Sequence, residues 1–210
     1  MKIIGNATIV TLGDQAVIEQ INKQLNRLIP TIKVMDLPLS ESIEVEIALA
    51  KGKKLYVRIP GWCSEPVFSE KYTVKNGYAV IDITDNNFNV DIDFNMEPVF
   101  YYASPCVRAD IGKTALMYGP VLYCIEKADN DFELFDCTVD TAKDVAVTFD
   151  EYFNAPVLTA QGYVAESENC KNLYRTEKPC DGKPTAIKYI PYFGFANRGE
   201  SDMRVWVRYK

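Results

Sequence analysis

The sequence predicts a mainly β protein with two antiparallel β-sandwich-type units and a short N-terminal β-α-β appendage. Three observations support this fold class. Many segments alternate apolar and polar residues, as a strand does when one face is buried and the other meets water. Glycine, proline and asparagine separate these segments at short intervals, which is typical of β-sandwiches. A clean helical period occurs in one stretch, near the N-terminus.

The N-terminal stretch predicts a strand, a helix and a second strand. Residues 7–12 are mostly apolar, and Asp14 is a suitable N-cap for the helix that follows. Between Gln15 and Ile29 the apolar residues fall on one helical stripe: Val17, Ile18, Ile21, Leu25, Leu28 and Ile29. Pro30 ends the helix, and residues 31–37 predict the second strand. We therefore expect residues 1–37 to be a short β-α-β appendage to the sandwich units. Such a unit leaves at least one sheet edge unpaired.

Residues 38–112 predict the first sandwich unit. In "SIEVEIAL" the apolar residues alternate with Glu44 and Glu46, which places both glutamates on the solvent face. The segments "KLYVRIPGW" and "NVDIDFNM" alternate in the same way. Asn76-Gly77 lies between two strand-like flanks and is a strong signal for a two-residue hairpin turn.

Residues 113–210 predict the second sandwich unit, after a boundary near Asp110–Thr114. Gly119-Pro120 indicates a sharp turn between two apolar strands. Further strands are predicted in "VAVTFDEYF", "VLTAQGYVAE", "TAIKYIPYFGFAN" and "MRVWVRYK".

Composition and charge exclude several classes of partner. The 210 residues carry a net charge of −6, which disfavours nucleic acid and anionic membrane surfaces, since both require a basic face. No apolar run approaches the roughly 20 residues that span a bilayer. The N-terminus "MKIIGNATIV" does not have the pattern of an export signal, so we expect a cytoplasmic protein.

The ionisable residues show no complete catalytic set. The chain has no histidine, which removes the commonest general base and metal ligand. Carboxylate pairs alone can hydrolyse glycosides, but no spacing among the 29 acidic residues selects a pair. We therefore expect no catalytic residues, no cofactor and no bound metal.

Six cysteines are present: Cys63, Cys106, Cys124, Cys137, Cys170 and Cys180. We favour free, mostly buried thiols over three disulfides, because a chain of this length does not need covalent staples. A zinc site that includes Cys170 and Cys180 is a weaker alternative, since it would need thiolate and carboxylate ligands.

Four residues are candidates for ligand binding. Trp62, Tyr192 and Phe195 could stack on the C–H face of a sugar, and Phe193 belongs to the same "IPYFGFANRG" stretch. Burial in the core or in a seam between domains is the favoured alternative for these aromatic residues. Arg198 could bind a carboxylate or a sugar hydroxyl, but an ion pair with Asp or Glu across a corner of the sandwich is favoured.

Residues of about 40–210 resemble the C-terminal β-sandwich region of glycoside hydrolase family 127, the β-L-arabinofuranosidases. The stretches that carry the resemblance are "LYVRIPGWC", "VKNGYAVIDI", "VRADIGKTALMYGPVLYCIEKADN" and "IPYFGFANRGESDMRVWV". In that family the chemistry lies in a preceding helical barrel, where a zinc-bound cysteine of an adjacent Cys-Cys pair acts beside glutamates. This chain has no such pair, so the resemblance implies a hydrolase lineage without catalysis here.

Residues 7–37 resemble the second half of an ACT domain, as in the small subunit of acetolactate synthase. The stretch that carries this resemblance is "TIVTLGDQAVIEQINKQLNRLIPTIKVMDL". The half that meets the amino-acid effector in such domains is missing, so effector binding does not transfer. Two origins within one chain indicate a natural fusion, a truncated gene or an artificial join.

These observations lead to one preferred function and two alternatives. We expect a non-catalytic accessory part of a β-L-arabinofuranosidase-like hydrolase, whose partner is a missing catalytic barrel domain or another copy of the chain. The first alternative is a stand-alone carbohydrate-binding module. The second is an ACT-like regulatory module that senses a branched-chain amino acid.

Overall fold

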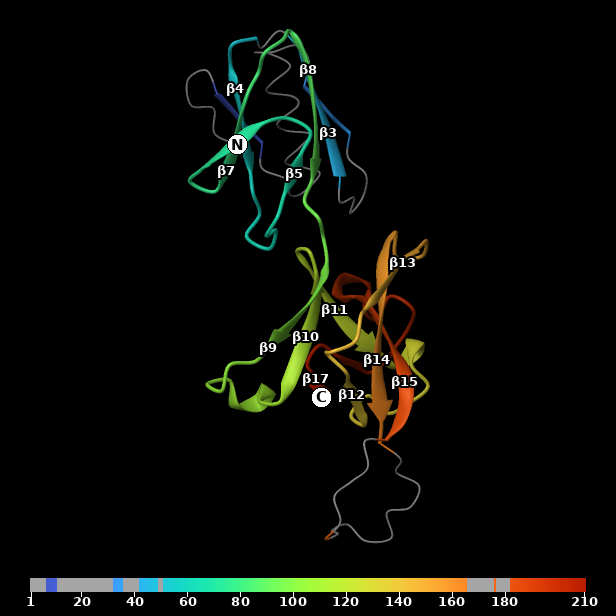
Figure 1. Cartoon of the computed structure of the whole chain (residues 1–210). Coiled ribbons are helices and arrows are strands. Elements are labelled where there is room, and N and C mark those ends of the chain that lie inside the picture. Colours follow the sequence, from blue (N-terminus) through green and yellow to red (C-terminus); the bar gives the residue numbers. More distant parts are fainter. Residues whose placement is uncertain (1–6, 11–31, 36–41, 49–50, 166–175, 177–181) are drawn as a thin grey trace. The chain divides into compact units, whose positions relative to one another are not determined.

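The computed structural model describes residues 7–10, 32–35, 42–48, 51–165, 176 and 182–210 (Figure 1). The predicted helix between Gln15 and Ile29 lies outside the described residues, as do Cys170 and Cys180. The described part is mostly β-strand, as predicted. It divides into two compact units, residues 1–96 and 97–210. None of its helices is long and apolar enough to cross a membrane.

The described residues of the first unit form two four-stranded sheets. One has the order β1 (Ala7–Val10), β4 (Lys54–Arg58), β7 (Tyr78–Asp82), β6 (Tyr72–Lys75). The other has the order β2 (Ile32–Met35), β3 (Ser42–Ala48), β8 (Asn87–Asp93), β5 (Val67–Phe68). One hydrophobic cluster joins inward residues of both sheets, among them Leu55, Ile81, Val45 and Val90. This shared core confirms the predicted sandwich.

The two N-terminal strands add to edges of different sheets in this unit. β1 pairs in parallel with β4, whereas β2 pairs antiparallel with β3. The strands that flank the predicted helix therefore do not form a sheet of their own. An isolated strand–helix–strand piece has unpaired backbone groups, and pairing with β4 and β3 satisfies one edge of each strand.

Two predicted turns are confirmed by their backbone geometry. Asn76 and Gly77 both have positive φ, 52° and 78°, as a type I′ turn requires, and they join β6 to β7. Gly119 has φ 53° at the first position of the two-residue turn that joins β10 to β11, where glycine is favoured in a type II′ turn.

In the second unit, the part of the chain that the structure describes forms one nine-stranded sheet that closes on itself. Six strands form a closed ring of pairings: β10 (Lys113–Tyr118), β11 (Val121–Glu126), β15 (Lys183–Pro191), β14 (Ala155–Val164), β12 (Cys137–Val139) and β17 (Val207–Tyr209). β9 (Pro98–Tyr102), β13 (Ala146–Asp150) and β16 (Met203–Arg204) extend it. The 3-10 helices are η1 (Arg108–Asp110), η2 (Lys127–Asp129) and η3 (Tyr192–Gly194).

The ring closes because β10 pairs with two strands along the same edge. Its N-terminal residues pair with β17 and its C-terminal residues pair with β11. Lys113 and Thr114 pair with β17, and Met117 and Tyr118 pair with β11. The interior is filled by large side chains such as Tyr123, Leu158 and Ile187. This closed arrangement removes most free edges from the sheet.

β9 belongs to the second unit, because it pairs along its whole length with β10. The boundary between the two units therefore falls between Met96 and Glu97, on the N-terminal side of the boundary expected near Asp110–Thr114. The segment from Ala103 to Gly112 resembled a domain boundary in the sequence. In the structure it connects β9 to β10, two paired strands of the same unit.

Candidate functional site

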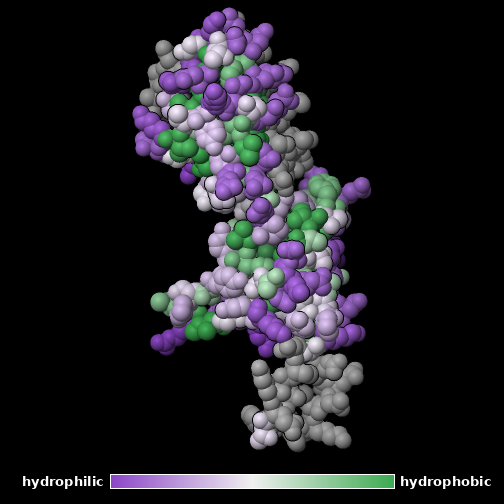
Figure 2. Space-filling model, viewed as in Figure 1, coloured by the Kyte–Doolittle hydropathy of each residue, from purple (hydrophilic) through white to green (hydrophobic). Residues whose placement is uncertain are grey.

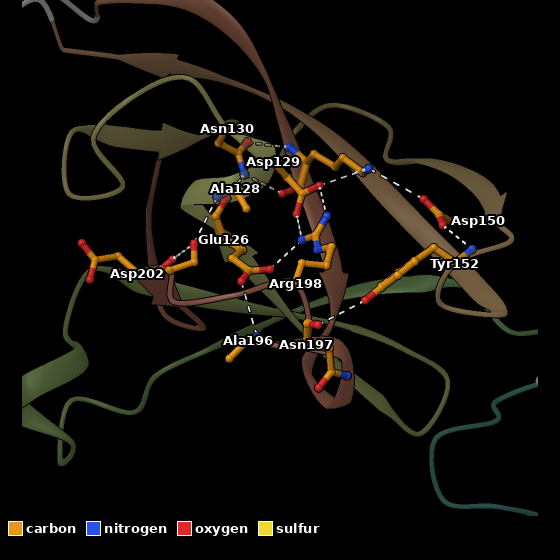
Figure 3. A network of polar contacts seen from close by, with 12 residues as sticks. Glu126, Ala128, Asp129, Asn130, Asp150, Tyr152, Ala196, Asn197, Arg198 and Asp202 are labelled. Atoms are coloured by element: carbon orange, nitrogen blue, oxygen red, sulfur yellow. Dashed lines mark hydrogen bonds and ion pairs between the residues drawn. The ribbon is translucent and has the colours of Figure 1, made fainter.

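A network of charged residues lies at the end of β11 in the second unit (Figure 3). Glu126 is the last residue of β11, and its side chain has no exposed surface. Asp129 ends η2, with 5% of its side chain exposed. Arg198 donates to Glu126 Oε2 at 2.6 Å and to both carboxylate oxygens of Asp129, with the Asp129 Oδ1 contact at 2.8 Å. One guanidinium thus pairs with two nearly inaccessible carboxylates.

Asn130 holds this end of β11 against β15. Its side-chain amide donates to the carbonyl of Glu126 at 2.9 Å and to the carbonyl of Lys188 at 3.1 Å. Its side-chain oxygen accepts from the amide of Lys188 at 3.0 Å. Asn130 is 3% exposed, so these bonds satisfy a polar group that would otherwise be costly to bury.

Lys188 of β15 extends the network towards β13. Lys188 Nζ lies 3.3 Å from Asp129 Oδ1 and 3.8 Å from Asp150 Oδ2. The Asp150 carboxylate also accepts from the backbone amide of Tyr152 at 2.9 Å. The network therefore links β11, β13, β15 and the turn after η3.

Electrostatics keep the pair of Asp129 and Arg198 ionised. Burial raises the pKa of the Asp129 carboxyl, but the hydrogen bond from Arg198 and the charge of Lys188 outweigh it, so its pKa lies below the usual value. The hydrogen bond to Asp129 raises the pKa of Arg198 further above its usual range. A carboxylate held in this way is a poor general acid, because it does not carry a proton near neutral pH.

Phe153 is the centre of an aromatic cluster beside the network. The rings of Tyr152 and Phe153 are 5.0 Å apart and nearly perpendicular, at 88°. The guanidinium carbon of Arg198 lies 5.0 Å from the centre of the Phe153 ring. Gly194 packs so closely that a Cβ there would lie 2.6 Å from two atoms of this ring. The η3 turn and the ion pair are thus both held against one buried side chain.

The structure brings three of the four predicted ligand residues into one turn. Tyr192 begins η3 and is 46% exposed, Phe195 follows η3 and is half-buried, and Arg198 lies three residues further on. Trp62 lies in the first unit, where it packs on the core with its ring centre 6.1 Å from that of Phe94. The ion pairs of Arg198 confirm the alternative predicted for it, and core packing describes Trp62. Ligand binding by these four residues stays a prediction.

Sequence reasoning missed Glu126, Tyr152 and Phe153. A glutamate that closes the otherwise apolar run "VLYCIE" was an available signal for a buried, paired carboxylate. Asp129 and Asn130 lie three and four residues after Glu126, and both take part in the contacts above.

The described cysteines are free thiols. Cys63, Cys124 and Cys137 are buried, and Cys106 is exposed. Burial raises the pKa of Cys124 to about 12 and that of Cys137 to about 11, so both are inert as nucleophiles near neutral pH. In the described part of the chain, no three residues among His, Cys, Asp and Glu gather as a metal site would require.

Comparison with curated proteins finds two kinds of relative. The non-reducing end β-L-arabinofuranosidase of Bifidobacterium longum is 29% identical over 169 residues, a match that covers 72% of this chain and 25% of that protein. The acetolactate synthase small subunit of Aquifex aeolicus is 52% identical over 50 residues, which covers 24% of this chain and 26% of that protein. The chain thus spans about a quarter of the length of either relative.

Comparisons with solved structures and with family models indicate the same family as the Bifidobacterium longum relative. The crystal structure of Ara127N, a β-L-arabinofuranosidase from Geobacillus stearothermophilus T6, superposes with a TM-score of 0.77 at 27% identity. The superposition covers 85% of this chain and 30% of that one. The model of the glycoside hydrolase family 127 C-terminal domain matches residues 98–208, from the first residue of β9 into β17. This match covers more than half of the sequence, and the chain therefore belongs to the glycoside hydrolase family 127 C-terminal domain family.

Proposed function

We propose that this chain is a non-catalytic accessory part of a β-L-arabinofuranosidase-like hydrolase, with a structural role between domains. The observation that carries the proposal is a largely exposed surface of the second unit whose strand and first connecting residues, Pro98 to Val107, carry no charged side chain. We call it the β9 arm, residues 98–112. It comprises β9 and the connection from β9 to β10 (Figure 1).

The β9 arm presents apolar side chains to solvent. No residue from Pro98 to Val107 is charged. The exposed apolar residues of the arm are Val99, Tyr101, Tyr102, Val107 and Ile111. Hydrophobic residues are visible on this projecting segment in Figure 2. An uncharged edge strand invites pairing and aggregation, and proteins usually protect such edges with charges or cover them.

The β9 arm has a defined conformation of its own. The amide of Val107 donates to the carbonyl of Ser104 at 2.8 Å, and Lys113 Nζ donates to the carbonyl of Ala109 at 2.6 Å. Lys113 also pairs with Asp110 at 3.0 Å. These bonds order the connection without burying its apolar side chains, which suits a surface that contacts another domain.

The partner that fits this surface is the catalytic domain of a longer family 127 protein. The matched family is a C-terminal domain, and this chain spans 30% of the superposed arabinofuranosidase. The absence of catalysis is supported by the lack of histidine and by the ion pairs that hold Glu126 and Asp129. Binding of a branched-chain amino acid stays a prediction, as does a cytoplasmic location.

Two measurements test the proposal. We expect purified chain to leave a chromogenic β-L-arabinofuranoside intact, and measurable turnover would refute the non-catalytic role. We also expect a fluorescent hydrophobic dye to bind the chain, and its signal to fall in the Val107→Ser, Ile111→Ser variant. The control is Val74→Ser, because Val74 is at least as exposed, at 62% against 47% for Val107 and 59% for Ile111, but lies in the first unit. A chain that sediments as a clean monomer and binds no dye would contradict the interdomain role.

A further inference from the structure

A second exposed surface of the second unit differs in chemistry from the β9 arm. Three exposed aromatic side chains belong to the two segments that meet at the buried Phe153: Tyr152 is 61% exposed, Tyr192 is 46% exposed and Phe193 is 57% exposed. We call these four residues the Phe153 cluster. Its exposed members are all aromatic, and two of them carry a hydroxyl group. The β9 arm, in contrast, includes exposed aliphatic side chains and suits a protein partner.

The backbone segments that carry the exposed rings are anchored on the buried Phe153 side chain. Tyr152 directly precedes Phe153 and contacts its ring. Tyr192 and Phe193 directly precede Gly194, whose backbone packs against the same ring. The amide of Phe195 donates to the carbonyl of Tyr192 at 3.2 Å and closes the turn. Both segments therefore meet at one buried side chain.

The charged network also contacts the Phe153 cluster through Arg198. Arg198 is fixed by Glu126 and Asp129, and its guanidinium lies over the Phe153 ring. Tyr152 donates its hydroxyl to the carbonyl of Asn197 at 3.4 Å (Figure 3). A rigid aromatic surface loses little conformational entropy when a ligand binds, which favours binding.

Polar groups lie beside the exposed rings. Asn197 is exposed, and its amide donates to the carbonyl of Phe193 at 3.4 Å, a long bond that leaves hydrogen-bonding capacity. The side chain of Lys188 is 36% exposed at the edge of the network. A sugar presents an apolar C–H face between hydroxyl groups, so aromatic faces with nearby amide and ammonium donors match it. An unmixed apolar surface does not.

We propose that the Phe153 cluster is a carbohydrate-binding surface, with Tyr152, Tyr192 and Phe193 as stacking residues and Asn197 as a hydrogen-bonding residue. This proposal goes beyond the interdomain role. It revises the expected sugar contacts, because Arg198 has a structural role in orienting the cluster and Trp62 lies in the other unit. The choice of an arabinose polymer as the probe rests on the proposed function.

Affinity electrophoresis of the full chain in native gels that contain sugar-beet arabinan tests the proposal. We expect arabinan to retard the chain, and Tyr152→Ala and Tyr192→Ala each to raise the dissociation constant about tenfold, the factor that corresponds to about 1.4 kcal/mol. Tyr101→Ala is the matched control, because Tyr101 is an exposed tyrosine on the β9 arm. Thermal melting of each variant verifies that its fold is intact.

Three results would overturn the proposal: no retardation of the wild-type chain, equal retardation of all variants, or equal loss in the Tyr101→Ala control. None of these bears on the interdomain role, which the dye measurement and its Val107 and Ile111 variant test separately. A chain that binds arabinan, sediments as a clean monomer and binds no dye would keep the sugar surface and refute the interdomain role.

Discussion

Replacing Arg198 with methionine is the most informative perturbation of this protein. The variant Arg198→Met keeps the aliphatic stem and removes the guanidinium. Glu126, whose side chain is fully buried, would keep the amide of Ala196 at 3.4 Å as its remaining described side-chain contact. Asp129 would keep Lys188 at 3.3 Å.

The expected cost is large because one carboxylate is left buried without a cation. Breaking a buried ion pair by removing one partner destabilises proteins by about 3–5 kcal/mol. Domains are stable by only about 5–15 kcal/mol, so the second unit would lose a substantial part of its free energy of unfolding. The Arg198→Met, Glu126→Gln double variant should recover much of that loss, since a neutral amide needs no counter-charge.

Urea unfolding measured by tryptophan fluorescence tests these values. The chain has two tryptophans, Trp62 in the first unit and Trp206 in the second. A Trp62→Phe background therefore leaves one reporter for the unit that contains Arg198. A loss below about 1 kcal/mol would refute the reasoning, because that value is typical of an exposed salt bridge. A double variant no more stable than Arg198→Met would refute it as well.

The free energy of unfolding should change in opposite directions with falling pH in the wild type and in Arg198→Met. In the wild type the pKa of Asp129 is lowered on folding, so its contribution is present above the unfolded value of about 3.9 and is lost as pH falls through the folded value. In Arg198→Met the buried Glu126 carboxylate has lost its cation, so proton uptake at that carboxylate favours the folded state. Between pH 7 and pH 5 the variant should gain stability while this contribution in the wild type stays constant. A variant with no such gain would contradict this account.

Three further predictions concern single side chains of the second unit. Gly194→Ala should lower the melting temperature by several degrees, because its methyl group would lie 2.6 Å from atoms of the Phe153 ring and overpacking costs about 1–3 kcal/mol. Tyr189→Phe should raise stability by about 1 kcal/mol in chemical unfolding, because the Tyr189 hydroxyl is buried without a hydrogen-bond partner among the described residues. Cys106→Ser should remove one fast-reacting thiol from the folded chain in a thiol titration, whereas Cys124→Ser should remove none.

Matched controls distinguish these effects from general damage. Gly61→Ala is the control for Gly194→Ala, since a Cβ at Gly61 meets no atom within 4 Å. A fall in stability for Tyr189→Phe would mean that its hydroxyl has a partner such as a buried water. Rapid reaction of Cys124 in the folded chain would mean that the second unit opens readily.

Local signals predicted the strands and turns because their causes are local. Asn76-Gly77 specifies a type I′ hairpin turn through the positive φ that both residues tolerate. The alternation around Val45 and Ile47 follows from the two faces of a strand, and both residues are buried as expected. These features depend on neighbours a few residues away, so the sequence contains the information directly.

Pairings between distant segments could not be predicted in the same way. β1 and β2 are close in sequence, but they join different sheets because the free edges of β4 and β3 are available only once the first unit has formed. The alternation that predicted the strands of residues 113–210 does not distinguish an open sandwich from the closed ring, which depends on β10 pairing with both β11 and β17.

The sequence by itself determined a mainly β chain of two units, without histidine and with an acidic net charge, because composition, alternation and turn residues act locally. The tertiary structure decided which side chains meet. Glu126 and Arg198 are 72 residues apart in the chain and 2.6 Å apart in space. A buried carboxylate is stable only where a cation is brought to it, and the position of that cation follows from how β11 and the turn after η3 pack around Phe153.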